Sequence, residues 1–344
     1  VLKTAKRALL QTQFFLYTPH PAPLQNGPSS VINQNMTLIP TQKRAYALDA
    51  LRGFAILTMV LSGTIAYKIL PAWMYHAQLP PPDHKFNPNL PGLTWVDLVF
   101  PLFLFSMGAA LPLALSSRLA KGWGKRKIVL SILKRGCLLG AFAIILQHFR
   151  PQVINPNQSG IEKWPIALVG FFLLFFMFVR LPASWNSQKI RNTITLSAWI
   201  AAIILLASLQ YPDDSGFSLS RSDIILIVFA NMAVFGSIFW LLTQHNLFLR
   251  LGLLVLLFSL QWLSTANSAI ASVLSASPIP WLYQFNYLKY LFLVIPGTIA
   301  GDLIFSWMQK TADDKEKGGW KINRFLSITG LIVAIELILR CQEQ

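Results

Sequence analysis

The hydrophobic residues of this chain gather into long runs and do not alternate with polar residues. Nine runs approach the roughly 20 residues that a helix needs to cross a bilayer, at a rise of about 1.5 Å per residue. Because an open strand edge is unstable in lipid, each run is expected to be helical. The pattern predicts an all-α, polytopic integral membrane helical bundle of about nine to eleven transmembrane helices, with spans near 48–70, 94–115, 129–148, 164–181, 192–210, 223–242, 247–263, 286–308 and 325–340.

Composition and charge agree with this picture. The 344 residues are 54% hydrophobic and 12% charged, with a mean hydropathy of +0.52, which excludes a soluble domain of this length. A net charge of +16 would suggest nucleic acid in a soluble protein. Here the cations concentrate in alternate segments, so we expect no nucleic acid partner and a cytoplasmic N-terminus, with cytoplasmic segments at 116–135, 180–191 and 310–324.

The chain is expected to contain one membrane domain. Residues 1–43 are predicted to be a disordered extension or an over-called start, with Met36 as a natural beginning, and residues 44–344 to form the multispan domain. The only cysteines, Cys137 and Cys341, cannot build a disulfide framework and have no metal-ligand spacing, so no metal is expected.

The stretch "LPGLTWVDLVFPLFLFSMGAALPLAL", residues 90–115, places an acid and two prolines in an apolar run. Thr94 precedes Asp97 by three residues, which is the spacing of a capping box, so Asp97 is explained by helix capping alone or by capping together with chemistry. Pro101 should kink the helix, and a kinked helix with small residues can line a cavity.

Two charged residues mark the preceding span. Asp49 and Arg52 are three residues apart on one helical face. They form either a local ion pair or, with Arg52 beside flexible Gly53, a guanidinium fork for a phosphate group.

The segment between these two spans carries His76, Asp83 and His84 and is stiffened by three consecutive prolines. Histidine is the usual general base, but a lone loop histidine is more often solvated surface.

Deeper in the chain, Asp302 lies at membrane depth after Pro296 and Gly297, where helix breakage would expose backbone groups to a cavity. Asn231 and Glu336 are weaker cases that an interhelical hydrogen bond would explain.

The segments "ALDALRGFAILTMV", "HA" and "GLTWVDLVFPLFLFSMGAAL" together resemble the heparan-α-glucosaminide N-acetyltransferase family and its bacterial relatives of the DUF5009 type. "VIPGTIAGD" is a second, fainter match. The family's Arg-Gly element corresponds to Arg52 and Gly53, its catalytic His-Ala to His76 and Ala77, and its Asp-Leu-Val-Phe-Pro element to residues 97–101. The family histidine is closer to that Asp, so this loop carries an insertion and His84 is a rival. The active-site asparagine of the human-type enzyme falls near Ser62 or Gly63.

The resemblance implies that an acetyl or other acyl group passes from cytoplasmic acetyl-CoA, a co-substrate, to an amino sugar or glycan on the outer side of a bacterial inner membrane. His76 or His84 would act as base or acyl carrier at the outer mouth, beside Asp97. Partners would be the donor, the acceptor and the bilayer, with a homodimer as one oligomeric alternative. The predicted donor-binding residues are Arg52, Gly53, Lys125, Arg126 and Lys127.

A transporter is the main competing class, because a broken helix and a mid-span Asp302 also suit a sugar or ion permease. A non-catalytic membrane scaffold is a third reading. The absence of an inverted sequence repeat, and the concentration of family-like residues in two adjacent spans, favour the acyltransferase.

Overall fold

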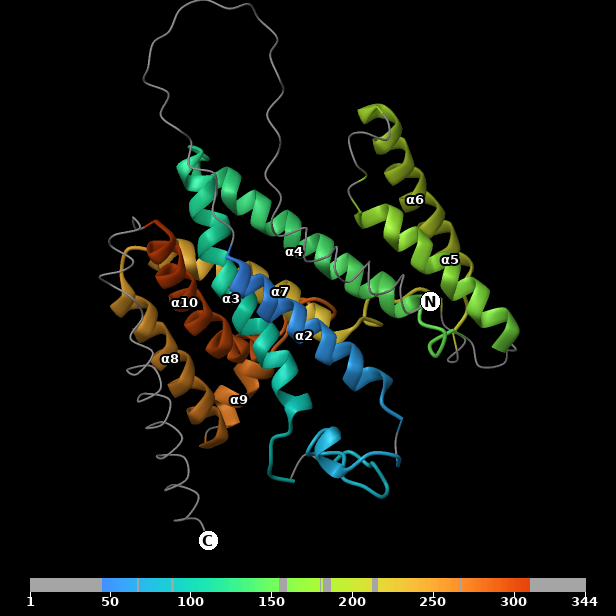
Figure 1. Cartoon of the computed structure of the whole chain (residues 1–344), viewed down its shortest axis with the longest axis horizontal. Coiled ribbons are helices and arrows are strands. Elements are labelled where there is room, and N and C mark those ends of the chain that lie inside the picture. Colours follow the sequence, from blue (N-terminus) through green and yellow to red (C-terminus); the bar gives the residue numbers. More distant parts are fainter. Residues whose placement is uncertain are drawn as a thin grey trace, which may run out of the picture. The chain divides into compact units, whose positions relative to one another are not determined.

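The computed structural model describes residues 45–66, 68–87, 90–154, 160–179, 181, 187–211, 216–266 and 268–309. The chain divides into two compact units, residues 1–302 and 303–344, and the second is described only by the last turns of one helix, at 303–309. Within these ranges the regular elements are all helical (Figure 1). They are α2 (Tyr46–Thr64), η1 (Ala72–Met74), α3 (Trp95–Ala120), α4 (Lys125–His148), α5 (Gly160–Phe178), α6 (Gln188–Ser208), α7 (Ile224–Thr243), α8 (Leu247–Ala266), α9 (Ser268–Ser275), η2 (Phe285–Tyr290) and α10 (Leu291–Gln309).

Seven described helices are long and apolar enough to cross a membrane: α2, α3, α4, α6, α7, α8 and the continuous η2–α10 segment. A shorter apolar helix, Lys163–Phe178, lies within α5. The all-helical, multi-pass class is therefore confirmed. These helices correspond to the first eight predicted spans, whereas 325–340, Glu336 and the extension 1–43 fall outside the described residues. The total of nine to eleven spans stays a prediction.

The core of the first unit lies where α3, α4, α7 and the start of α10 meet. Leu104, Ile128, Met232 and Leu291 are fully enclosed there. A second cluster joins the end of α4 to α5 and α6 around Phe149 and Ala202. Helix α2 packs against α3 and not into either cluster, so most of its surface is exposed.

Two predicted boundaries are wrong for identifiable reasons. Helix α2 ends at Thr64, not at residue 70, because the Tyr75 hydroxyl binds the next backbone groups, accepting from Leu70 N at 3.0 Å and donating to Ala66 O at 2.8 Å. The segment 116–135 is mostly helical, since α3 continues to Ala120 and α4 begins at Lys125.

The predicted break at Pro296 and Gly297 is also wrong. Helix α10 is continuous from Leu291 to Gln309. The glycine instead permits close packing on α3, because a Cβ on Gly297 would overlap the carbonyl oxygen of Phe105. Gly301 meets Ala109 O and Gly108 meets Val294 O in the same way, so backbone contacts backbone along this crossing.

Candidate active site

His76 and Asp97 come together where the loop of residues 65–94 joins α3. The imidazole Nδ1 lies 2.5 Å from Asp97 Oδ1. Because an ionised carboxylate only accepts hydrogen bonds, Nδ1 carries the proton and Nε2 is left with its lone pair. The His76 side chain is 50% exposed, that of Asp97 only 12%, and within the described part of the chain Nε2 has no hydrogen-bond partner. The arrangement is an oriented imidazole that presents a basic nitrogen to solvent.

Asp97 caps its helix as well as holding His76. The capping box is present, with Asp97 Oδ2 accepting from Thr94 N at 2.9 Å. The same oxygen accepts from Ala77 N at 3.2 Å, and the Thr94 hydroxyl lies 2.7 Å from Tyr75 O. Each carboxylate oxygen therefore has its own function, and the two explanations of Asp97 are compatible.

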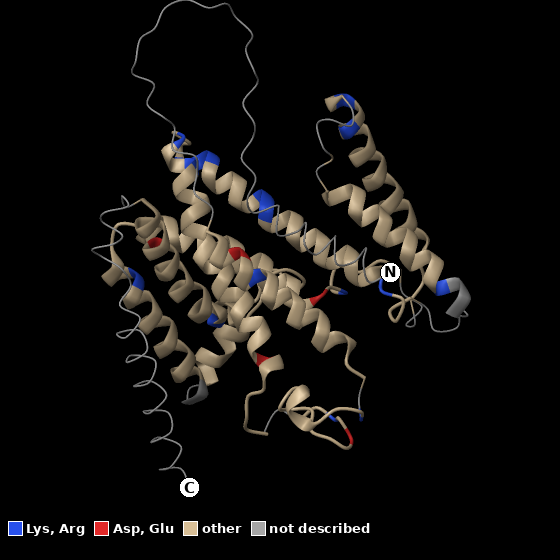
Figure 2. Cartoon of the chain, viewed as in Figure 1, with Lys and Arg blue, Asp and Glu red and all other residues tan. Residues whose placement is uncertain are grey.

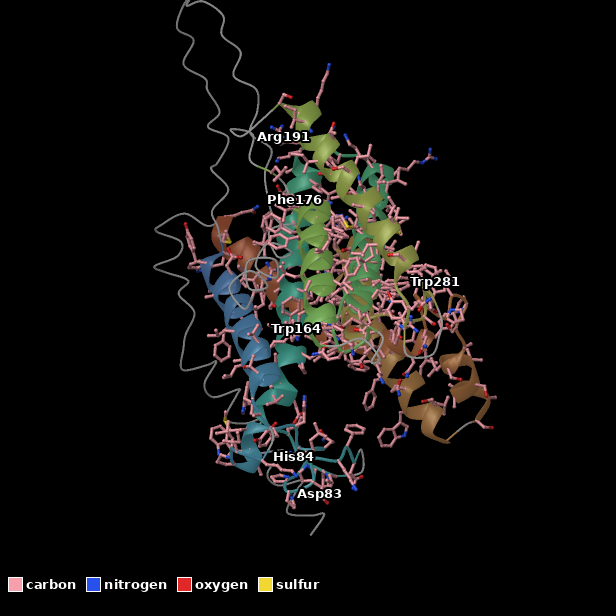
Figure 3. All side chains as sticks on the ribbon, turned by 90° about the vertical axis from the view of Figure 1, so that its right-hand side faces the viewer. Asp83, His84, Trp164, Phe176, Arg191 and Trp281 are labelled. Carbon is pink, nitrogen blue, oxygen red and sulfur yellow. The ribbon has the colours of Figure 1, made fainter. Side chains whose placement is uncertain are left out.

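His84 is engaged by its own loop. Its Nε2 accepts from Lys68 N at 3.2 Å, its Nδ1 lies 3.2 Å from Leu79 O, and its ring meets Tyr75 edge to face at 4.6 Å. Figure 3 shows His84 and Asp83 on this loop, beyond the ends of the helices. Both ring nitrogens are occupied, so in this conformation His84 fixes the fold of the loop.

Arg52 is a buried cation with few partners. Its side chain is 8% exposed, Nη2 donates to Ser106 O at 3.2 Å, and Nη1 is 3.8 Å from Asp49 Oδ1. The predicted local ion pair is therefore present but long. A guanidinium carries five N–H donors, and among the described residues only Ser106 O and Asp49 lie against the Arg52 guanidinium.

A cavity opens beside Arg52 between α2, α3, α4 and α7. Arg118 and Arg135 share its wall with Arg52, and Ser237 adds a hydroxyl. Arg118 Nη1 donates to Ser131 Oγ at 3.0 Å. The apolar part of the wall consists of Met107, Ala110, Leu111, Ala114, Leu115, Ile132 and Ala233. The cavity is small, about 40 Å³, and its three arginines on a largely apolar wall have the chemistry to hold an anion.

The other predicted donor-binding residues lie outside this wall. Lys125, Arg126 and Lys127 form the exposed first turn of α4, which has no acid, and Lys127 Nζ sits 4.6 Å from the centre of the Trp123 ring. Figure 2 shows basic residues gathered at this junction of α3 and α4. Gly53 is next to Arg52, with open space where a Cβ would stand.

Asp302 is paired inside the bundle. Its Oδ2 lies 2.6 Å from Nη1 of Arg250, whose side chain is 4% exposed, and its Oδ1 accepts from Trp240 Nε1 at 3.0 Å. These contacts join α7, α8 and α10. Asn231 donates to Ile227 O of its own helix and to Leu282 O in the turn before η2, both at 2.8 Å. Its bonds are therefore not interhelical as predicted, and they join α7 to that turn.

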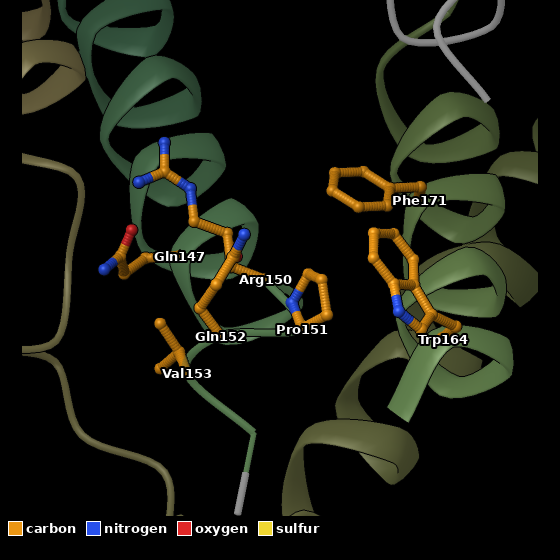
Figure 4. Close-up of a pocket in the computed structure, with 7 residues that line it drawn as sticks. All are labelled: Gln147, Arg150, Pro151, Gln152, Val153, Trp164 and Phe171. Carbon is orange, nitrogen blue, oxygen red and sulfur yellow. The ribbon is translucent and has the colours of Figure 1, made fainter. Parts of the chain in front are cut away.

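A second, open cavity lies between the end of α4 and α5. Figure 4 shows Trp164 and Phe171 of α5 facing Pro151, with Arg150 beside it. The Arg150 guanidinium is already bound to Asp223 at 2.5 Å. Nearby, burial raises the pKa of Tyr211 to about 12, so its phenol stays neutral. None of the described residues that line this cavity is a base, and Arg150 is paired with Asp223.

Sequence reasoning located Arg52, His76 and Asp97 but did not single out Arg118 and Arg135. Both lie in the basic 116–135 segment, and only the packing of α3 on α4 shows that they share a cavity. The structural role of Tyr75 was also missed, because nothing in the sequence indicates which backbone groups its hydroxyl binds.

Comparison with known proteins adds two findings. The family model described as "Domain of unknown function (DUF5009)" matches residues 44–304, which is most of the chain. Over 136 residues the chain is 30% identical to heparan-alpha-glucosaminide N-acetyltransferase of Mus musculus. That stretch is 40% of this chain and 18% of the mouse protein, so the match covers less than a fifth of that relative. The resemblance drawn from the motifs is confirmed.

Proposed function

The chain belongs to the DUF5009 family, and on that premise we propose that it is a membrane acyltransferase acting across the bilayer. It takes an acetyl or other acyl group from cytoplasmic acetyl-CoA and gives it to an amino sugar or glycan on the outer side. The partial similarity to an N-acetyltransferase supports the reaction class. The single observation that carries the proposal is the His76–Asp97 pair with Nε2 open.

His76 is the base in the proposed reaction. Nε2 accepts a proton from the acceptor amine as the amine nitrogen attacks the thioester carbonyl carbon. The carbon–sulfur bond then breaks, CoA leaves as a thiolate, and the proton held on Nε2 neutralises that thiolate. Asp97 holds the ring in the required tautomer and stabilises the imidazolium while it exists. Because a thioester is already activated, positioning supplies much of the rate.

A two-step route uses the same atoms. Nε2 attacks the thioester carbonyl carbon first and CoA leaves as a thiolate. The acceptor amine then displaces the imidazole, and the proton that the amine loses goes through solvent to the thiolate. The routes differ in whether an acyl-histidine forms, and mass spectrometry of protein quenched with acetyl-CoA but without acceptor distinguishes them. In either route His84, with both ring nitrogens bound within its loop, supports the loop and not the chemistry.

The arginine-lined cavity is the proposed donor site. Arg52, Arg118 and Arg135 bind the phosphate groups of CoA, and the apolar wall accommodates the pantetheine arm. Ser106, which accepts from Arg52, follows Asp97 by nine residues, about 14 Å along a helix. The arm would bridge this separation. Lys125, Arg126 and Lys127 raise the positive potential near the cavity, and Gly53 leaves space for the ligand.

The proposal includes a topology. The α3–α4 junction faces the cytoplasm, the N-terminus is cytoplasmic, and the 65–94 loop is on the outer side of a bacterial inner membrane. The full count is nine to eleven spans, and a homodimer is one oligomeric arrangement. Cysteine labelling from either side of spheroplasts tests the orientation. The labelled positions are Lys121→Cys and Asp83→Cys, in a background with Cys137→Ser and Cys341→Ser.

Transfer itself is tested with purified protein, acetyl-CoA and a panel of amino sugars. We expect CoA thiol to appear only when an acceptor is present. If acetyl-CoA binds but is not turned over with any acceptor, the proposed transfer is refuted. If acetyl-CoA does not bind either, the proposed donor site is refuted as well.

A further inference from the structure

The 65–94 loop exposes large apolar side chains outside the spanning helices. Ile69 is 74% exposed, Trp73 63%, Phe86 70% and Leu93 69%. Scattered apolar surface is ordinary in soluble proteins, but four large side chains within one short loop are typical of a surface that contacts an apolar phase.

The loop cannot bury these side chains by collapsing, because its own hydrogen bonds fix it. The Tyr75 hydroxyl bridges Leu70 N and Ala66 O. The His84 ring joins Lys68 N to Leu79 O. Asn87 N donates to Gln78 O at 2.9 Å. The apolar side chains are therefore held outward on a built scaffold.

Cations accompany the apolar residues. Lys68 precedes Ile69 and Lys85 precedes Phe86, both lysines are exposed, and Asp83 is the only acid in the loop. Tryptophan together with lysine is the usual composition of the membrane–water interface, where the ring lies at headgroup depth and the ammonium reaches lipid phosphates. The loop also connects directly to α2 and α3, two helices long enough to cross the bilayer.

We propose that the 65–94 loop lies in the lipid–water interface, with Ile69, Trp73, Phe86 and Leu93 among acyl chains and Lys68 and Lys85 at lipid phosphates. It follows that His76 meets acceptors whose amine or hydroxyl is carried on a membrane-anchored amphiphile. This second part rests on the proposed acyl transfer; the placement of the loop does not.

Loop placement is tested without any activity. In a background of Cys137→Ser and Cys341→Ser, a spin label is attached at Phe86→Cys or, as the matched control, at Asp83→Cys, and the protein is reconstituted into vesicles of phosphatidylethanolamine and phosphatidylglycerol. We expect the label at 86 to collide mainly with dissolved oxygen and the label at 83 mainly with a water-soluble nickel chelate. Equal access to the chelate at both positions would overturn the proposal. Low access to both reagents at 86 would also overturn it, since protein would then cover the site.

Acceptor class is tested in the same vesicles with two glucosaminides that share a headgroup, one methyl and one long-chain alkyl. We expect kcat/KM to be about tenfold or more higher for the long-chain acceptor, because the bilayer concentrates it at the loop. A double variant, Trp73→Ser with Phe86→Ser, should lose this preference and keep its rate on the methyl acceptor. Equal rates in the unmodified protein would overturn the acceptor assignment. Turnover of neither acceptor would overturn acyl transfer itself, while the labels still report where the loop lies.

Discussion

The Nδ1 atom of His76 lies 2.5 Å from the Oδ1 atom of Asp97, although 21 positions separate the two residues. The pair connects a loop outside the spanning helices to the first turn of α3, so the helix start fixes the orientation of the imidazole. The His76 side chain is half exposed, so the contact that fixes the ring also leaves its other nitrogen open to solvent.

Replacing His76 by Ala should lower acyl transfer by about 10²-fold or more, because the proton acceptor is removed. Acetyl-CoA should still bind, since the arginine cavity is unchanged. The matched variant is His84→Gln, whose rate in the folded protein should stay within about threefold, as both ring nitrogens of His84 bind backbone groups of its own loop. The measurement is CoA release with binding followed separately by calorimetry. If the rate of CoA release falls further in His84→Gln than in His76→Ala, His84 is the base and His76 is not.

Asp97→Asn should reduce turnover by about 10²-fold or more, because an amide no longer enforces the Nδ1–H tautomer or stabilises the imidazolium. The amide oxygen still accepts from Thr94 N, so the thermal midpoint should fall only slightly. Thr94→Val provides the opposite pattern, with about 1 kcal/mol of stability lost and most of the rate retained. If the turnover rate of Asp97→Asn falls only as far as its loss of folded protein explains, Asp97 serves only to cap α3.

Arg52→Met and Arg118→Met should each weaken acetyl-CoA binding by about tenfold or more, since charge-assisted hydrogen bonds to phosphate are lost from an apolar wall. Arg191→Gln on α6 removes the same charge without touching the cavity and should leave binding unchanged. The measurement is the Kd of acetyl-CoA against that of pantetheine, which lacks the nucleotide. If the Kd values of acetyl-CoA and of pantetheine rise by the same factor, these arginines do not recognise phosphate.

Gly297→Ala should destabilise the protein by about 1–3 kcal/mol, because its Cβ would overlap the Phe105 carbonyl and force α10 from α3. Gly63→Ala serves as the control: open space surrounds that position, and alanine favours the helix. Thermal unfolding in detergent measures both. A thermal midpoint for Gly297→Ala at or above that of Gly63→Ala would show that the crossing is looser than described.

The hydrophobic runs predicted the helices because exposing unpaired backbone groups to lipid is costly and leaves few alternatives to a helix. A helix of the structure lies at each of eight predicted spans. The ends were less predictable, since α2 stops where the Tyr75 hydroxyl binds Ala66 and Leu70. Both His76 and His84 precede Asp97 in the same loop, so spacing alone could not choose between them. Arg118 and Arg135 were hidden among topology signals, and Asp302 could not be paired with Arg250 before α8 and α10 were placed in space.

Acyl transfer by this protein is tested by measuring CoA thiol release by the purified protein in lipid nanodiscs, with and without an amino-sugar acceptor. Equilibrium binding of acetyl-CoA is measured on the same sample. We expect saturable binding, thiol release only when the acceptor is present, and loss of that release in His76→Ala with binding retained. Failure to bind any acyl-CoA would contradict the account and favour transport.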